Sequence, residues 1–477
     1  MPKDNKLNTG QKALQINLDA KKYGTFAEIG AGQEVARWFF HVGKASGTVA
    51  KTISAYDMAV SDAIYGPSDR YVSRMRLQSM LDLEFTLILQ RLDKAIGDRR
   101  TFFAFANTVT TKHISKAGEE GGHGWLGIKF QTVPRGEPSS IIIHTRLLDW
   151  ETSRQQEVVG ILGVNLIHGA FYQHLEPERL IGSLLDGLSG QRVEVDMIKF
   201  SGPAFKGVDN RLMALQLVQQ WLTEAAMFTA DGETVIPSEL LYKKPVLLER
   251  GSFRPLTNPM LDMLERGQEM FVQQAALQGE APVVMFEMTL RQLQVGDAID
   301  HRDFLDRVDM LGALGKPVLI SNFLRYHRLV TYLSRHTQKP VGLPLGLVRL
   351  RDVMDEKFYT DMPGGLMESL GQLFKNGAKL YVYPSLDKKT GKLTTVENFE
   401  VAPNLRHLYR HLLENKFIEN ITNFNADSLK IYSGDVLAKI QAGDESLAQL
   451  IPAQIFEVIK AKKLFGWGQK APTPVAA

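Results

Sequence analysis

Apolar and polar positions along the chain divide it into three zones with different periodicities. Between residues 26 and 100 the pattern is mostly helical, and apolar side chains spread broadly around the stretch from Arg70 to Ile96, as in a well-buried helix. Residues 101–150 contain three runs typical of strands, TFFAFANTV, GWLGIKFQTV and SSIIIHTRLLD, separated by turns rich in glycine and proline. This part is therefore predicted to form an antiparallel sheet beside helices.

From about Val158 onward, short apolar runs alternate with helical segments. The eight runs are LGVNLIHGAF, RVEVDMIKFSG, AAMFTADG, PVLLERGSF, PVVMFEMTL, PVLISNFL, PVGLPLGL and KLYVYP. Eight βα units over about 240 residues match the size of a (β/α)₈-like barrel. An open doubly wound sheet has the same alternation, so that alternative stays open.

These zones predict an α/β protein with an N-terminal α+β domain, a (β/α)₈-like barrel and a helical C-terminal cap. The expected boundaries are a flexible N-terminus at 1–25, the α+β domain at 26–156, the barrel at 157–400, the helical cap at 401–468 and a disordered tail at 469–477.

Composition excludes several classes of protein. Of 477 residues, 44% are hydrophobic and 23% are charged, which is ordinary for a globular protein, and no cysteine is present for disulfides, iron–sulfur clusters or thiol nucleophiles. The net charge of +3 (56 basic minus 53 acidic residues) argues against nucleic acid as a partner. The N-terminal residues are polar, and no apolar stretch approaches the length of a membrane span. We therefore expect a cytoplasmic protein that does not bind membranes, and the sequence leaves a homo-oligomer open.

Ionisable side chains occur inside or just after the apolar runs, where the carboxyl ends of barrel strands would meet in one mouth. The candidate catalytic residues are Asp196, Lys199, Asp231, Glu249 and Glu287. The candidate substrate- or phosphate-binding residues are Asn165, His168, Arg250, Arg254, Asn322, Gly364 and Gly365. Carboxylates could serve as general acid and base or hold Mg²⁺, although no cofactor is indicated, and the basic groups could neutralise a phosphate. The alternative is a structural network of ion pairs, such as Asp196–Lys199 and Glu249–Arg250.

Known loop motifs are absent. Gly43 and Gly47 do not have the spacing of a P-loop, and no dinucleotide-binding glycine motif follows a strand. Gly364 and Gly365 precede a predicted helix, whose first N–H groups could hold a phosphate. His123, between glycines, is either a catalytic histidine in a loop or an ordinary exposed one.

Several phrases resemble those of a bacterial family of unknown activity, over about residues 35–465. They include KTISAYDMAVSDAIYG, GHGWLGIKFQ, EVDMIKFSG, VLLERGSFRP and LKIYSGDVLAKIQAGD. Members of that family carry the names nicotinate-nucleotide adenylyltransferase or TonB-dependent receptor. The second name requires a signal peptide and many alternating strands, which the sequence lacks. The first requires a phosphate motif whose nearest match, Gly169 to His174, lacks the proline and has a shortened spacing.

Two functions from different classes follow. The first is an enzyme, with transferase chemistry as the favoured class, that acts on a phosphorylated or nucleotide-like small molecule at the mouth of the barrel. The second is a non-catalytic scaffold or assembly protein whose polar residues form structural ion pairs. If the carboxylates are catalytic, replacing Glu287 by glutamine should leave stability unchanged or raise it.

Overall fold

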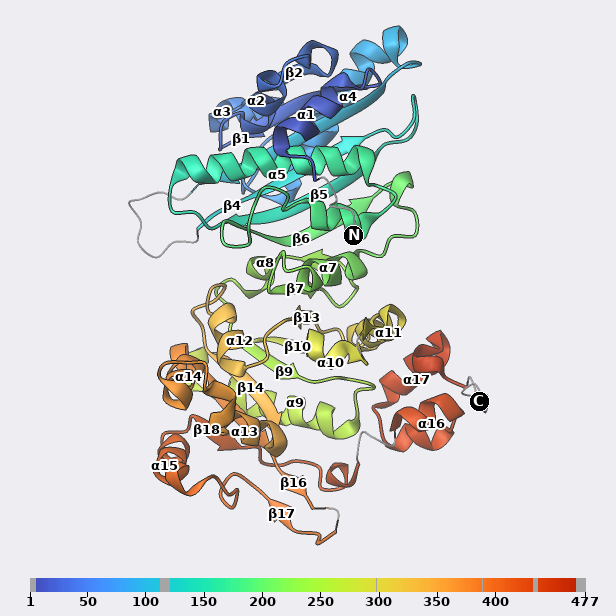
Figure 1. Ribbon diagram of the computed structural model, residues 1–477. Helices are drawn as coiled ribbons and strands as arrows, with labels where there is room; N and C mark the ends of the chain where they lie inside the picture. Colours follow the sequence, from blue (N-terminus) through green and yellow to red (C-terminus); the bar gives the residue numbers. More distant parts are fainter. Residues whose placement is uncertain (1–5, 112–120, 297, 388, 432–435, 469–477) are drawn as a thin grey trace. The chain divides into compact units, whose positions relative to one another are not determined.

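The computed structural model describes residues 6–111, 121–296, 298–387, 389–431 and 436–468. The chain divides into two compact units, residues 1–226 and 227–477, each with its own main sheet (Figure 1). The tail expected at 469–477 lies outside the described residues. Among the helices that the structure describes, none is both long and apolar enough to span a membrane.

The first unit is built on a six-stranded mixed sheet with the order β2-β1-β3-β4-β5-β6. Its strands are β1 (Lys22–Ile29), β2 (Val49–Ile53), β3 (Thr101–Thr110), β4 (Gly122–Phe130), β5 (Ser139–Leu147) and β6 (Val193–Ser201). Strand β1 is parallel to β2 and β3, whereas the pairs β3–β4, β4–β5 and β5–β6 are antiparallel. The antiparallel sheet predicted for residues 101–150 is thus confirmed.

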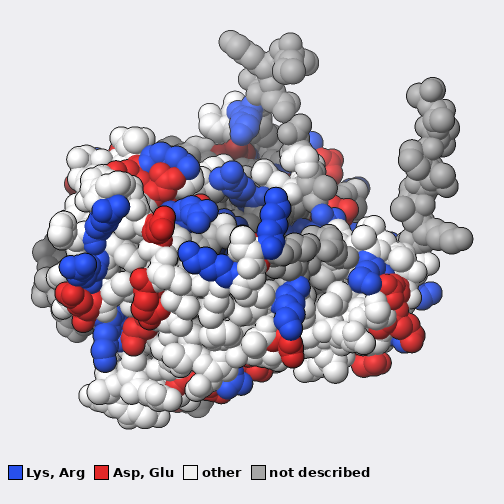
Figure 2. Space-filling view, turned by 90° about the horizontal axis from the view of Figure 1, so that it is seen from below, with Lys and Arg blue, Asp and Glu red and all other residues white. Residues whose placement is uncertain are grey.

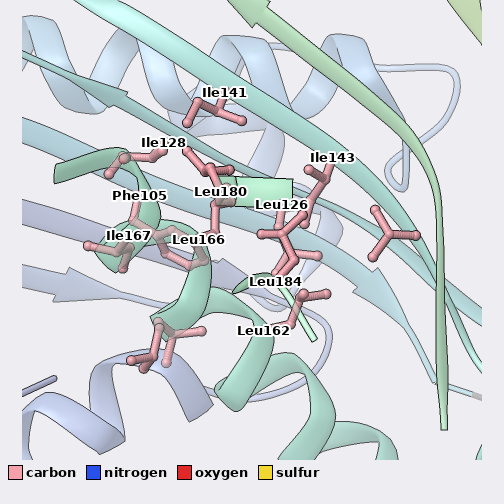
Figure 3. Close-up of a cluster of buried hydrophobic side chains, with 14 of the residues drawn as sticks. Phe105, Leu126, Ile128, Ile141, Ile143, Leu162, Leu166, Ile167, Leu180 and Leu184 are labelled. Carbon is pink, nitrogen blue, oxygen red and sulfur yellow. The ribbon is translucent and has the colours of Figure 1, made fainter. Parts of the chain in front are cut away.

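Helices cover both faces of this sheet. They are α1 (Thr9–Leu18), α2 (Glu34–His41), α3 (Met58–Tyr65), α4 (Arg74–Ile96), α5 (Thr152–Tyr172), α6 (Pro177–Ser183) and α7 (Asn210–Gln219). Side chains on one face of β3, β4 and β5 pack against α5 to form the larger core (Figure 3). Helix α4 packs on the opposite face, where Phe85 and Ile88 contact Phe102 and Ala104. Because successive strand residues point to opposite faces, β3 contributes Phe103 and Phe105 to one core and Phe102 and Ala104 to the other.

Helix α1 corrects the expectation that residues 1–25 are flexible. Asn8 and Gln11 form a capping box at its first turn, and Ala13 and Ile16 are fully buried in the larger core. The short helix is therefore held by packing, although its polar sequence resembles that of a loose terminus.

Glycines in α5 allow α2 to approach closely. A Cβ built on Gly163 would lie 2.3 Å from Val35 Cγ2 and 3.0 Å from Phe105 Cζ. We expect Gly163→Ala to lower the free energy of unfolding by about 1–3 kcal/mol in urea denaturation, since overpacking outweighs the better helix propensity of alanine. As a control, Gly371 lies in α14 (Gly365–Leu373) with open space around its Cβ position. Gly371→Ala should leave stability unchanged or raise it by up to about 1 kcal/mol, and equal effects at both positions would contradict the packing argument.

The second unit contains an eight-stranded sheet with the order β18-β15-β14-β9-β10-β13-β7-β8. Its strands are β7 (Ala225–Phe228), β8 (Thr234–Val235), β9 (Val246–Arg250), β10 (Val283–Thr289), β13 (Val318–Ser321), β14 (Val341–Gly346), β15 (Lys379–Tyr383) and β18 (Ile418–Asn420). Six of them, from β18 to β13, are parallel to one another. Numbered along the chain, these six have the order 3-2-1-4-5-6, which is that of a doubly wound dinucleotide-binding fold.

The remaining elements of this unit are helices and two small hairpins. The helices are α8 (Pro237–Leu241), α9 (Asn258–Val272), α10 (Leu290–Leu293), α11 (His301–Gly312), α12 (Tyr326–Leu333), α13 (Leu347–Val353), α14, α15 (Arg406–Glu414), α16 (Val436–Ala442) and α17 (Ala453–Lys462). The hairpins pair β11 (Gln294–Val295) with β12 (Ala298–Ile299), and β16 (Ser385–Leu386) with β17 (Leu393–Thr394). On the face shown in Figure 2, basic and acidic side chains are intermixed.

The expected (β/α)₈-like barrel is not found among the described strands. The sheet is open, with β18 at one edge and β8 at the other. Of the eight apolar runs, LGVNLIHGAF is part of α5 and RVEVDMIKFSG is strand β6 of the first unit. Strands and helices alternate along the chain in both barrels and doubly wound sheets, so this alternation cannot distinguish the two folds.

Candidate functional site

The strand order of the second sheet reverses between β9 and β14. These two strands pair only through Val246–Leu247 and Val341–Gly342, at their first residues. In open α/β sheets, ligands bind outside the carboxyl ends of the strands at such a reversal. The fold therefore directs attention to the carboxyl ends of β9, β10, β13 and β14.

A pocket of about 500 Å³ lies at these strand ends. Arg250 is the last residue of β9 and Thr289 the last of β10, and both line the pocket. Residues 324–326 follow β13, and Arg349 lies in α13 directly after β14. Four central strands thus contribute to one cavity.

Arg250 is fixed at the wall of this pocket by a buried network. Its Nε and Nη2 donate to Glu287 Oε2 at 2.7 Å and Oε1 at 2.8 Å, and Ser321 Oγ also donates to this carboxylate. The guanidinium lies 4.6 Å from the ring centre of Tyr326. Burial opposes the charge of Arg250, but the attraction of Glu287 outweighs it, so the pKa of Arg250 is raised.

Three further arginines line the pocket. Arg325 forms a two-pronged pair with Asp361 at 2.7 and 3.1 Å, and Arg349 pairs with Asp352 at 3.0 Å. Arg291 forms no ion pair with any residue that the structure describes. Exposed ion pairs contribute about 0–1 kcal/mol, so Arg325 and Arg349 can exchange their partners for a bound anion. The pocket therefore contains one arginine without an ion-pair partner among the described residues, Arg291, and two arginines, Arg325 and Arg349, that can turn from their present partners to a bound anion.

Aromatic side chains form the rest of the wall. Tyr326, Phe358 and Tyr359 line the pocket, and the Arg325 guanidinium lies 5.5 Å from the ring centre of Tyr359. The hydroxyl of Tyr326 is buried without a hydrogen-bond partner. Burial raises the pKa of Tyr326 to about 12, so this hydroxyl keeps its proton at neutral pH.

The predicted pair of Glu249 and Arg250 does not form. Consecutive residues of a strand point to opposite faces of a sheet. The register pairs Arg250 with Glu287 and Glu249 with Phe286, so Glu249 lies on the other face of β9. Its carboxyl is fully buried, burial raises its pKa well above the usual range, and Oε2 has no hydrogen-bond partner.

Four of the predicted site residues lie in the first unit instead. Asp196 and Lys199 are in β6, so they belong to a different sheet from Glu249 and Glu287. Asn165 and His168 are in α5, not at the end of a strand. Asn165 Oδ1 accepts a hydrogen bond from buried Lys12 at 2.8 Å. The expectation that the predicted carboxylates come from consecutive strands of one barrel is therefore wrong.

Other predicted residues of the second unit are held by local contacts. Asp231 is exposed in the turn between β7 and β8 and accepts from Thr229. Arg254 pairs with Asp303 of α11 at 2.6 Å, and Asn322 directly follows β13. Neither Arg254 nor Asn322 lines the pocket.

Gly364 and Gly365 begin α14, as predicted. The N–H of Gly364 donates to Glu368 Oε2 at 2.9 Å. This helix start thus already holds a carboxylate of its own chain, which competes with the phosphate expected there.

Of the site residues predicted from the sequence, Arg250 lines the pocket, and most of the other lining residues were not predicted. Arg291 and Arg325 directly follow the runs MFEMTL and LISNFL, which is a usable sequence signal. Tyr326 begins helix α12, and most of the later residues of that helix are buried in the core, so the helical pattern does not single out Tyr326 as a pocket residue. Among described residues, no group of three or more His, Asp or Glu side chains is placed to hold a metal ion.

Comparisons with known proteins give only weak matches. No protein-family model and no curated protein matches the chain. Among solved structures, the competence/damage inducible protein CihA from Agrobacterium tumefaciens is 16% identical, with a TM-score of 0.26, and covers 34% of this chain and 96% of its own. A competence-damaged protein (CinA) superfamily protein from Enterobacter cloacae is 12% identical, with a TM-score of 0.27, over 36% and 96%. The competence damage-inducible protein A from Klebsiella pneumoniae is 14% identical, with a TM-score of 0.26, over 35% and 100%. At these values the similarity supports no inference about activity.

Proposed function

We propose that the second unit binds a phosphorylated, nucleotide-like small molecule in the pocket at the carboxyl ends of β9, β10, β13 and β14. The observation that carries this proposal is the position of a pocket of about 500 Å³, lined by four arginines, where the strand order reverses. A cavity of this volume is within the usual range for small-molecule sites.

The phosphate would bind to the arginines at the mouth. Arg291 has no carboxylate partner among the described residues, and Arg325 and Arg349 hold theirs through partly exposed pairs. Guanidinium groups bind phosphate through two parallel hydrogen bonds, which are stronger than those between neutral groups. Arg250 would shape the floor of the pocket, because Glu287 already occupies two of its donors.

A planar base would bind to the aromatic wall. Tyr326, Phe358 and Tyr359 offer aromatic side chains against which a base can stack. The combination of rings and arginines favours a nucleotide over a simple sugar phosphate. The proposal concerns binding, and the transferase reaction expected from the sequence stays a prediction.

Calorimetric titration with adenine and guanine mononucleotides, and with the matching nucleosides, tests this proposal. We expect one nucleotide to bind and its nucleoside to bind at least about tenfold more weakly, since each charge-assisted hydrogen bond contributes about 1.5–3 kcal/mol. Arg291→Gln should weaken nucleotide binding by about tenfold or more for the same reason. Arg328→Gln is the matched control, because Arg328 is an exposed arginine of α12 outside the pocket.

Two results would overturn the proposal. One is equal binding by the Arg291 and Arg328 variants, which would place any nucleotide elsewhere. The other is the absence of heat of binding and of thermal stabilisation with every nucleotide in the panel, since a ligand at 100 times its Kd raises stability by about 2.7 kcal/mol. In that case the buried pair of Arg250 and Glu287 would favour the alternative function, a scaffold with structural ion pairs.

A further inference from the structure

Three ionisable side chains form a continuous chain of hydrogen bonds in the first unit. His123 of β4, His144 of β5 and Asp196 of β6 come from neighbouring strands. His144 Nδ1 lies 2.6 Å from Asp196 Oδ1, and His144 Nε2 lies 3.2 Å from His123 Nδ1. His144 and Asp196 are buried, whereas His123 is only partly buried. The chain therefore leads from the interior to an accessible end.

An irregularity in the sheet aims Asp196 at His144. The register pairs His144 with Met197 and Thr145 with Val195, so Asp196 is the extra residue of a β-bulge. Bulges redirect side chains and are frequent beside active sites. The ring of Trp125, 4.8 Å from that of His144, packs beside it on the same face of the sheet.

The carboxylate fixes one end of this chain of hydrogen bonds. An ionised carboxylate can only accept, so His144 donates from Nδ1, and in the arrangement that leaves its Nε2 without a proton, that nitrogen accepts from Nδ1 of His123. The lone pair of His123 is then on Nε2, which makes no hydrogen bond to any described residue. We infer that His123, His144 and Asp196 form a proton relay whose outer atom, His123 Nε2, acts as a general base toward an anionic substrate.

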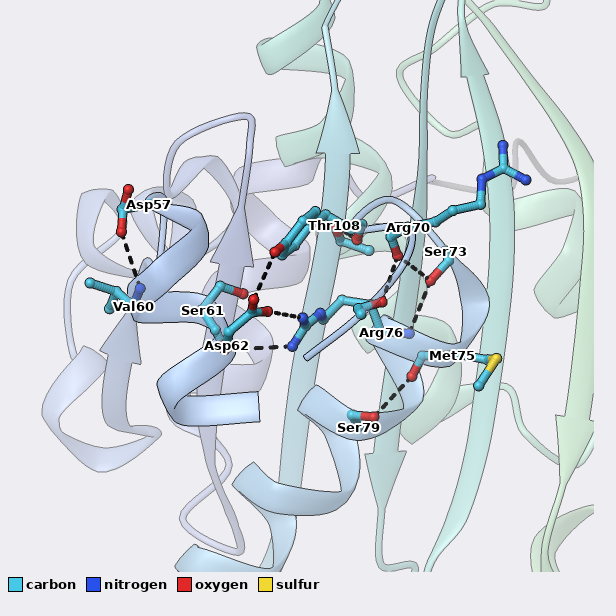
Figure 4. Close-up of polar contacts among 12 residues, drawn as sticks. Asp57, Val60, Ser61, Asp62, Arg70, Ser73, Met75, Arg76, Ser79 and Thr108 are labelled. Carbon is cyan, nitrogen blue, oxygen red and sulfur yellow. Dashed lines mark hydrogen bonds and ion pairs between the residues drawn. The ribbon is translucent and has the colours of Figure 1, made fainter. Parts of the chain in front are cut away.

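The surroundings of His123 favour a negatively charged substrate. Burial and His144, and to a smaller extent Arg70 and Arg146, lower the pKa of His123 to about 4, against the opposing effect of Asp196. His123 is therefore neutral at pH 7, and two arginines lie within electrostatic reach of it. Arg146 is paired with Glu194 at 2.9 Å, but Arg70 forms no ion pair with a described residue. Figure 4 shows its guanidinium extending away from the pair of Asp62 and Arg76.

The proton step balances within the relay. The O–H bond of a water molecule breaks, and its proton binds to His123 Nε2. The Nδ1 proton of His123 can move to His144 Nε2, which places the positive charge beside the carboxylate of Asp196. The water oxygen bonds to the electrophilic atom of an anionic ester, the bond to the alkoxide breaks, and the alkoxide takes the proton back.

Nuclear magnetic resonance of the full chain with ¹⁵N-labelled histidine tests the assignment of protons. We expect His123 to be neutral at pH 7, with its proton on Nδ1. Asp196→Asn should move the proton of His123 to Nε2, because an amide can donate to His144 and reverse the chain of hydrogen bonds. A proton on Nε2 of His123 in the unaltered chain would overturn the relay.

Modification by diethyl pyrocarbonate, mapped by mass spectrometry, tests access and charge. His123 should react in the unaltered chain and about fivefold or more slowly in Asp196→Asn, since the reaction needs a free lone pair. Exposed His407 is the internal reference for the amount of reagent. Millimolar inorganic phosphate should slow the reaction of His123, and Arg70→Gln should abolish this protection, whereas Arg91→Gln, at another exposed arginine, should not.

Three outcomes would refute the inference. They are an unreactive His123, a rate that Asp196→Asn does not change, and phosphate protection that survives Arg70→Gln. Tight binding of Zn²⁺ that requires both histidines would also refute it, because it would show that the two nitrogens are metal ligands with Asp196 behind them. None of these results depends on nucleotide binding by the second unit, so the two proposals fail independently.

Discussion

Replacing Glu287 by glutamine should lower the free energy of unfolding by about 3–5 kcal/mol. The Glu287 carboxylate is fully buried and accepts two hydrogen bonds from Arg250, whose side chain is 4% exposed. An amide removes the negative charge and one acceptor, so the guanidinium is left charged in the interior. This reverses the expectation from the sequence that the substitution leaves stability unchanged, because the basic partner of Glu287 lies on the adjacent strand.

A double substitution separates the charge pair from the packing. Replacing Arg250 by methionine and Glu287 by leucine removes both charges and keeps an apolar filling of similar size. We expect this double variant to be more stable than Glu287→Gln, since pairs of buried charges can often be replaced by apolar side chains at little cost. Urea denaturation measures both variants. A loss below about 1 kcal/mol for Glu287→Gln would show that water reaches the pair and that the network is not buried in solution.

The sequence predicted the elements better than their assembly. Five of the eight apolar runs became parallel strands of the second sheet, and the three runs of residues 101–150 became β3, β4 and β5. Periodicity is a local property, so it located strands but did not determine their neighbours. Strand β18 has only three residues, Ile418–Asn420, and forms one edge of the sheet. It pairs with β15, which lies far earlier in the chain. No local pattern could have indicated that pairing.

The same reason explains the outcome for the candidate site. The rule that polar residues gather at the carboxyl ends of parallel strands correctly selected Arg250, which lines the pocket. It selected Asp196 as well, but β6 is antiparallel to β5 and lies in the other sheet, so the rule did not apply to it. His144 was missed because a single histidine in an apolar strand has no sequence partner, and only the bulge at Asp196 brings its partner within 2.6 Å.

Glu28 should make the stability of the chain depend on pH. It is fully buried at the carboxyl end of β1, and burial raises its pKa to about 7. This occurs although the N–H groups of Val35 and Ala36, at the start of α2, and the amide of Asn107 donate to it. Hydrogen bonds to a carboxylate and the positive end of a helix favour the charged form. At Glu28 the loss of solvation outweighs both effects.

The sign of the pH dependence follows from the number of bound protons. Between about pH 4.5 and 7, the folded chain holds the proton of Glu28 and the unfolded chain has released it, so the folded state binds more protons. The stabilisation is complete below the pKa of the unfolded chain and is lost as the pH rises through 7. A shift of this size corresponds to about 3 kcal/mol. We therefore compare the unaltered chain with Glu28→Gln, which cannot titrate, by urea denaturation from pH 5 to pH 8.

The difference in unfolding free energy between the unaltered chain and Glu28→Gln should fall by about 2–3 kcal/mol over this range. Histidines with lowered pKa, such as His168 and His327, shift stability in the opposite direction, but they are present in both proteins and cancel in the difference. If the glutamine amide no longer accepts the hydrogen bond from the N–H of Ala36, the unfolding free energy of Glu28→Gln is lowered by the same amount at every pH. This loss does not change how the difference between the two proteins depends on pH. A difference that is constant with pH would mean that Glu28 stays charged throughout, and that the three donors around it outweigh its burial.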